Sequence, residues 1–136
     1  MTRDEIIAKV KALELPYGSY VVYGSCPLAA AGIREANDID IYAAPEVMDT
    51  LRERGWKEVR KGMRDIPLTH DVFDVHDNWS FSAYDPTLEH LLATADVYDD
   101  VPFASLEEVR KWKVASGRPK DLDDITRIDA HLAARG

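Results

Sequence analysis

The chain carries the run Tyr20-Val21-Val22-Tyr23-Gly24-Ser25 and, after twelve intervening residues, the run Asp38-Ile39-Asp40-Ile41. The first run has no polar alternation, which predicts a strand covered on both faces, and its Gly-Ser end predicts a turn. In the second run, side chains alternate between two faces of a strand, so the two acids point to one side and the two isoleucines to the other. We therefore expect a rigid pair of carboxylates close to a small-residue turn.

Helices and further strands are predicted on both sides of these runs. Capping boxes at Thr2 and Ser105 each begin a helix, Pro45 opens another, and Asp85-Pro86 is expected to cap a fourth. Strands are predicted over 56–59 and 72–75, a loop or loose hairpin over 60–70, and a tight hairpin over 97–103. The apolar residues Leu122, Ile125, Ile128 and Leu132 mark the terminal helix. This order predicts an α/β (α+β) fold, a mixed β-sheet flanked by helices, in one domain over residues 1–136.

Composition excludes several broad classes of function. With 136 residues, 46% hydrophobic and 31% charged, the chain has the composition of a globular domain. A net charge of −8 argues against sequence-independent nucleic-acid binding over a wide surface. No apolar run approaches the roughly 18 residues that a membrane helix needs, and the start lacks the layout of a signal peptide. A single cysteine, Cys26, fits a reducing compartment, so we expect a cytoplasmic protein without a membrane partner.

Three acids are candidates for one metal site. Asp38 and Asp40 share a strand face, and hard carboxylate oxygens held side by side suit Mg²⁺. A site with two metal ions about 3.5–4 Å apart needs a third carboxylate. Asp74 is preferred because it stands mid-strand between apolar neighbours, where an acid is costly unless it is paired or metal-bound. Asp71, three residues earlier, is the alternative.

The turn and several basic residues are candidates for holding phosphates. Gly24 and Ser25 would let a phosphate chain approach backbone N–H groups where the next helix begins. Arg34 lies between this turn and the acids, within reach of the same phosphates. Asp121 and Asp124 are expected to favour the positive end of the last helix. Two basic clusters, with solvated helix and loop charges as the structural alternative, are Arg60, Lys61 and Arg64, and then Arg110, Lys111, Lys113, Arg118 and Lys120.

Taken together, these motifs resemble the nucleotidyltransferase superfamily of DNA polymerase β. The shared pattern is a strand ending in Gly-Ser, a short helix, an Asp-apolar-Asp-apolar strand and a third acid on a later strand. Residues 112–125, WKVASGRPKDLDDI, are similar to a K-x-x-x-G-R-x-K-D-x-x-D-I pattern. That pattern recurs in small bacterial nucleotidyltransferase-like proteins related to abortive-infection toxins and minimal nucleotidyltransferases. The resemblance covers residues 19–128.

The resemblance implies a minimal nucleotidyltransferase fold and a Mg²⁺-dependent enzyme. Such an enzyme would transfer NMP from an NTP, here ATP or CTP, to an acceptor hydroxyl. Metal binding and catalysis would fall to Asp38, Asp40 and Asp74, and the phosphate turn to Gly24 and Ser25. The basic residues expected on the nucleotide side, as charge partners, are Lys113, Arg118 and Lys120.

Two questions stay open at this point. The acceptor is an RNA such as a tRNA end, a protein hydroxyl or a small antibiotic-like alcohol. The alternative function is a catalytically inactive module of the same fold, acting as a partner-binding or antitoxin-like protein. A partner protein or a homodimer is compatible with both functions.

Overall fold

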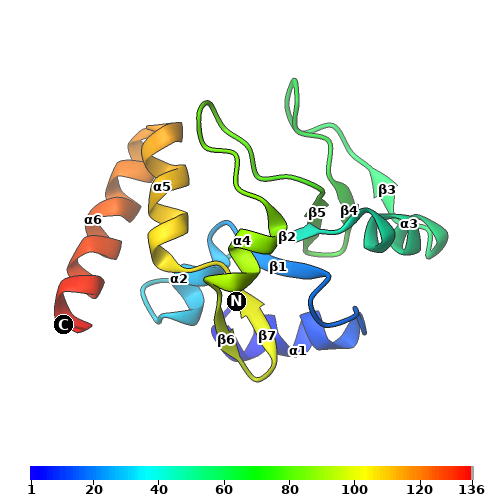
Figure 1. The fold of residues 1–136 in the computed structure, drawn as a ribbon, viewed down its shortest axis with the longest axis horizontal. Coiled ribbons are helices and arrows are strands. Elements are labelled where there is room, and N and C mark those ends of the chain that lie inside the picture. Colours follow the sequence, from blue (N-terminus) through cyan, green and yellow to red (C-terminus); the bar gives the residue numbers. More distant parts are fainter. Residues whose placement is uncertain (136) are drawn as a thin grey trace.

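The helices and strands follow the predicted order closely (Figure 1). The computed structural model describes residues 1–135, and in them an open mixed sheet is flanked by helices. The elements are α1 (Arg3–Ala12), β1 (Tyr20–Tyr23), α2 (Cys26–Ala30), β2 (Ile39–Ala43), α3 (Pro45–Glu53), β3 (Lys57–Glu58), β4 (Leu68–His70), β5 (Phe73–His76), α4 (Leu88–Ala93), β6 (Asp96–Tyr98), β7 (Val101–Phe103), α5 (Leu106–Ser116) and α6 (Pro119–Arg135). The α+β class predicted from the sequence is confirmed.

The acidic strand β2 lies at the centre of the sheet. The strand order is β3-β4-β5-β2-β1-β7-β6. Two neighbouring pairs, β2 with β5 and β1 with β7, are parallel, and the other pairs are antiparallel. The parallel pairing with β5 is what brings the acid of a distant segment beside the acids of β2.

The sheet separates two hydrophobic cores. One face packs against α1 and α3, whose buried residues are Ile6, Ile7, Val10, Val47, Met48 and Leu51. The other face packs against α4, α5 and α6 through residues that include Leu91, Leu106, Val109 and Ile128. In Figure 1, α5 and α6 lie side by side, away from α1 and α3. Because both faces of β1 are covered, all four of its residues are buried, as its apolar run predicts.

The caps of most helices are the predicted ones, with two corrections. Thr2 forms the capping box of α1. At α5 the Ser105 hydroxyl accepts from the backbone N–H of Glu108, but the Glu108 carboxylate bonds to Tyr84, His90 and Lys111 instead of completing the predicted box. The α4 cap is Thr87 instead of the expected Asp85. The side chain of Asp85 accepts a hydrogen bond from the Ser80 hydroxyl, so it is engaged within the preceding loop.

The inner face of α6 contains two acids as well as apolar residues. Leu122 is 57% exposed, whereas Asp121 and Asp124 are buried together with Ile128. Asp121 lies in the first turn of α6 and accepts from the Arg118 backbone N–H at 3.2 Å, as expected for an acid at the positive end of a helix, and both acids in addition pair with a buried lysine. Lys113 of α5 is itself 3% exposed, and its ammonium group attracts both carboxylates inward, which turns the helix away from the leucine.

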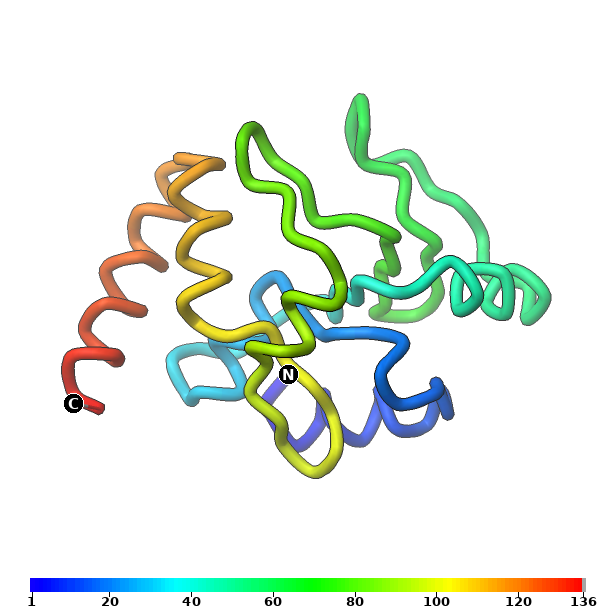
Figure 2. The backbone as a smooth tube through the Cα atoms, in the orientation of Figure 1, coloured from blue at the N-terminus to red at the C-terminus, as the bar shows by residue number. Residues whose placement is uncertain are grey.

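Two connections project from the sheet in the same direction. Figure 2 shows the β3–β4 and β5–α4 connections rising together from the part of the sheet that holds β4 and β5. The region predicted as a loop or loose hairpin over 60–70 contains β4, which pairs with both β3 and β5. None of the helices in residues 1–135 is long and apolar enough to cross a membrane.

Candidate functional site

The acids of β2 and β5 stand beside each other in the sheet. Asp40 is the register partner of Asp74 on the parallel neighbour and of Tyr23 on the antiparallel neighbour. Partners in adjacent strands project to the same face, so the two carboxylates face one another across β2 and β5. Asp38 precedes β2 and is exposed. Sequence spacing alone predicted the first pair of acids, and the register adds Asp74 to it.

The positions of Asp74 and Asp71 decide which of them lies beside the acids of β2. Asp71 lies in the β4–β5 turn with φ +52°, and its carboxylate is 3.5 Å from the Lys9 ammonium of α1. Asp74 is buried, and it pairs with the Lys61 ammonium at 2.7 Å and accepts from the Thr69 hydroxyl at 3.0 Å. Of these two acids, the one beside Asp40 is therefore Asp74.

The Gly24 turn packs directly against Asp40. Its φ is +71°, in the left-handed region that favours glycine. A Cβ atom at this position would lie 2.3 Å from the Asp40 carboxylate oxygen Oδ2. A side chain at residue 24 would therefore displace the acid, so the glycine fixes the contact between turn and carboxylate.

We expect Gly24→Ala to destabilise the protein and to displace the Asp40 carboxylate. Gly32→Ala is the matched control, because Gly32 also has a positive φ (+76°) but its Cβ would meet nothing within 4 Å. Both variants bear a left-handed backbone cost on the order of 1–2 kcal/mol, and only Gly24→Ala adds the clash. Urea unfolding of the two variants measures the difference. Equal losses of stability would show that the turn does not depend on this contact.

Burial and the neighbouring acids raise the proton affinity of Asp40. Burial is the largest cause, and the neighbouring carboxylates of Asp74 and Asp38 add to it, so the pKa of Asp40 rises to about 7. The positive charge of Lys61 acts in the opposite direction but is too small to cancel these effects. Near neutral pH the Asp40 carboxyl is therefore partly protonated.

A cavity of about 400 Å³ joins the turn and the acids of β2 to α6. Five residues predicted for the site line it, namely Ser25, Arg34, Asp38, Asp40 and Lys120. Four residues that the sequence analysis did not assign to a nucleotide site also line it, namely Asn37, Asp123, Asp124 and Arg127. Lys120 and Arg127 are seven residues apart on α6 and so share a face, a spacing that could have identified the arginine.

Arg34 connects the turn to α6. Its guanidinium group forms two hydrogen bonds to the Asp124 carboxylate, both 2.9 Å long, and donates a third to the Ser25 hydroxyl at 3.0 Å. Burial alone would raise the pKa of Asp124, but the hydrogen bonds from Arg34 and Lys113 hold this pKa below its usual range. These fixed contacts orient the Ser25 hydroxyl at the edge of the cavity.

Lys113 and Arg118 do not line the cavity. The Lys113 ammonium is buried behind it, 2.9 Å from Asp124 and 3.5 Å from Asp121. Arg118 donates to Asp121 at 2.7 Å and lies over the ring of Trp112. Burial of Asp121 acts against its ionised form, but hydrogen bonds from Arg118 and Ser116 lower the pKa of Asp121 to about 2. The segment 112–125, which carries the K-x-x-x-G-R-x-K-D-x-x-D-I pattern, therefore joins α5 to α6 through ion pairs.

A hydrogen-bonded chain continues along the same face of β5. The Tyr23 hydroxyl and His76 Nδ1 are 2.5 Å apart, and His76 Nε2 is 2.7 Å from a carboxylate oxygen of Asp65. Burial and the nearby carboxylates, Asp40 first among them, raise the pKa of Tyr23. The sequence placed His76 on one face with Asp74 but carried no signal for Asp65, which lies in the β3–β4 connection.

The acids offer oxygen donors of the kind that Mg²⁺ prefers. Asp74 is held by Lys61 and Thr69, so it would have to leave Lys61 to bind an ion. Across residues 1–135, no three His, Cys, Asp or Glu side chains are already arranged to hold a metal ion. In their donor chemistry, Asp38, Asp40 and Asp74 fit a divalent cation.

Comparison with known proteins adds no assignment. No family model, curated protein or solved structure matches this chain. Functional inference therefore depends on the geometry of the site and on the motifs themselves.

Proposed function

We propose that the protein is a Mg²⁺-dependent nucleotidyltransferase that transfers NMP from an NTP to an acceptor hydroxyl. The carrying observation is the alignment of Asp40 with Asp74 across β2 and β5, against a turn in which only glycine fits beside the acid. The cavity that Asp40 lines, which Asp74 does not, is also lined by Ser25, Arg34 and Lys120, and these groups suit phosphate oxygens. ATP or CTP is the proposed donor.

Each group of residues has a separate role in this proposal. The backbone at Gly24 and the hydroxyl of Ser25 would hold the β- and γ-phosphates, with Lys120 and Arg127 as cationic partners on α6. Arg34 would position Ser25, since its guanidinium already donates to Asp124, to the Ser25 hydroxyl and to the Glu35 carbonyl oxygen. Lys113 and Arg118 act indirectly, because their charges fix α6 and thereby the cationic wall.

The carboxylates Asp38 and Asp40 would hold Mg²⁺ on the triphosphate, and Asp40 with Asp74 would hold a second ion. Bound there, the ions would neutralise phosphate charge and lower the pKa of the attacking hydroxyl. The chain's own contribution is to align the donor so that the acceptor oxygen attacks the α-phosphorus in line with the departing pyrophosphate.

A second candidate function is a non-catalytic module of the same fold that binds a partner protein. The observation that favours it is the Lys61–Asp74 ion pair, which occupies the third acid at 2.7 Å. Conversion of this acid from ion pair to metal ligand costs the free energy of that pair. A module that binds no nucleotide would keep the ion pair permanently.

We expect ATP or CTP with Mg²⁺ to raise the melting temperature of the protein by several degrees. Saturation at about 100 times Kd stabilises a folded protein by about 2.7 kcal/mol. A thermal-shift screen of the four NTPs, each with Mg²⁺ and with EDTA, measures this effect. A metal-dependent rise supports the enzyme. If no NTP stabilises the protein in either condition, the module is favoured and the enzyme proposal fails.

A further inference from the structure

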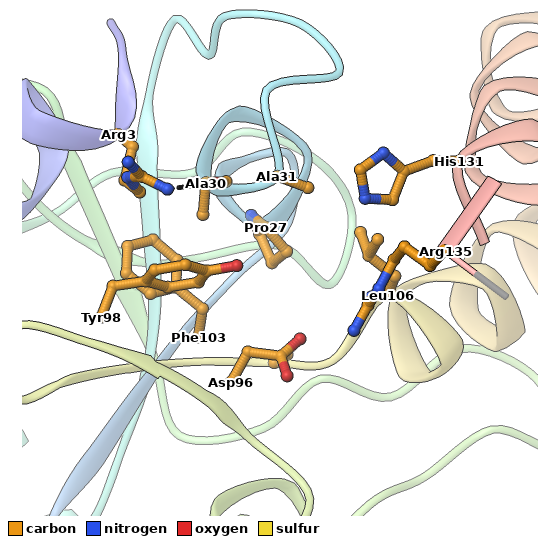
Figure 3. A pocket seen from close by; sticks show the side chains of 11 residues that line it. Arg3, Pro27, Ala30, Ala31, Asp96, Tyr98, Phe103, Leu106, His131 and Arg135 are labelled. Atoms are coloured by element: carbon orange, nitrogen blue, oxygen red, sulfur yellow. Dashed lines mark hydrogen bonds between the residues drawn. The ribbon is translucent and has the colours of Figure 1, made fainter.

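A second cavity, of about 280 Å³, lies where α2, the β6–β7 hairpin and the ends of α1 and α6 meet (Figure 3). It shares no lining residue with the cavity at Asp40. At roughly 30 Å³ per water molecule, its volume corresponds to about nine waters. This space suits a molecule, or part of a molecule, of about nine non-hydrogen atoms.

The wall of this second cavity is held in place by packing. Phe103 and Leu106 are buried, and the Tyr98 ring lies edge-on to Phe103 with 5.6 Å between centroids. The guanidinium of Arg3 lies 5.1 Å from the centre of the Tyr98 ring and donates to the carbonyl oxygen of Ala30 at 3.3 Å. One side of the cavity is therefore aromatic and already ordered.

Opposite charges face each other across the cavity. His131 and Arg135 are four residues apart on α6 and so lie on one face of that helix. Asp96 enters from β6 on the other side, and Figure 3 shows the three side chains directed toward the common space. Within residues 1–135, none of the three makes a side-chain hydrogen bond or an ion pair within 4.0 Å. The charges of Asp96 and Arg135 and the ring nitrogens of His131 are therefore available to a ligand.

We infer that this cavity binds a free α-amino acid as its zwitterion. Arg135 and His131 take the carboxylate, Asp96 takes the ammonium, and the amino-acid side chain rests on Tyr98. A simple amine fits less well because Arg3 and Arg135 repel it, and a simple anion fits less well because it leaves Asp96 without a partner. The assignment is independent of the proposed nucleotidyl transfer, since the two cavities have separate walls.

The test is an NMR titration of the full chain, labelled with ¹⁵N, with each of the twenty common L-amino acids at millimolar concentration. At least one is expected to shift the amide signals around residues 96–98 and 131–135. The deaminated acid and the methyl ester of that amino acid are expected to bind at least about tenfold more weakly, because each lacks one charged partner. If no amino acid shifts these signals, or if the deaminated acid binds equally well, the assignment is overturned.

Substitutions of Asp96 and Arg135 test whether their charges bind the amino acid. Asp96→Asn and Arg135→Gln are each expected to weaken binding by about tenfold or more. Asp100→Asn is the matched control, since it removes the same charge from the β6–β7 hairpin but does not line the cavity. Unchanged affinity in both Asp96→Asn and Arg135→Gln would contradict the proposal, and the control spectrum shows whether the hairpin tolerates such a change.

Discussion

Asp40→Asn is expected to stabilise the folded protein at pH 8 and to abolish its Mg²⁺-dependent response to NTP. The folded pKa of Asp40, about 7, lies above its usual 3.8. The folded state therefore holds the proton of the Asp40 carboxyl more tightly than the unfolded state does. This protonated carboxyl contributes its full stability below about pH 4, and the contribution is lost as the pH rises through about 7. Above that pH the ionised acid costs on the order of 2–4 kcal/mol, which the amide removes.

Urea unfolding of the wild type and of Asp40→Asn at pH 4 and pH 8 measures this effect. The two proteins should have similar free energies of unfolding at pH 4, and the variant should be more stable at pH 8. Asp38→Asn is the matched control, because this exposed acid should be needed for Mg²⁺, whereas its charge raises the pKa of Asp40 less than burial and Asp74 do, so most of the pH dependence should remain. Lower stability of Asp40→Asn at pH 8 would show that the carboxylates are not in mutual repulsion.

Asp124→Ala is expected to have the largest cost to stability, on the order of 3–5 kcal/mol. Its removal leaves the Lys113 ammonium, 3% exposed, with only the more distant Asp121, and it releases Arg34 from α6. Since a domain of this size has about 5–15 kcal/mol of stability in total, such a loss would unfold much of the protein on mild warming. The urea midpoint of the variant measures the cost.

Two further variants show whether the loss of stability in Asp124→Ala comes from the buried ion pair. Asp123→Ala removes the neighbouring acid, which forms an exposed i,i+4 pair with Arg127 at 3.1 Å, and it should cost less than about 1 kcal/mol. The double variant Lys113→Met with Asp124→Leu replaces the buried pair by apolar side chains and should recover most of the lost stability. Equal losses for Asp123→Ala and Asp124→Ala would contradict the ion-pair account.

Most of the fold could be predicted from the sequence because its signals are local. The apolar run at 20–23, the alternating run at 38–41 and the caps at Thr2 and Ser105 each specify a structure within a few residues. The face of α6 could not be predicted in the same way. Its orientation depends on Lys113, which lies on another helix, and a buried ion pair reverses the usual preference for leucine inside.

The candidate site was predictable in its acids and less so in its cations. Asp38 and Asp40 are linked by strand periodicity, and Asp74 by its position between apolar neighbours. Basic residues carry no such signal, because a long side chain can reach solvent, a phosphate or a buried acid from the same backbone position. Lys120 lines the cavity and Lys113 does not, a difference that depends on how α5 and α6 pack.

The most direct test of the proposed activity is label transfer from NTP radioactive at the α-phosphate, with Mg²⁺ and cell extract. The wild-type protein should produce a labelled acceptor with ATP or CTP, and Asp40→Asn, which is expected to be folded and more stable at pH 8, should produce none. Mass analysis of the labelled species would identify the acceptor. If the wild type transfers no label with any NTP, or if Asp40→Asn labels the same species equally, the nucleotidyltransferase account is contradicted.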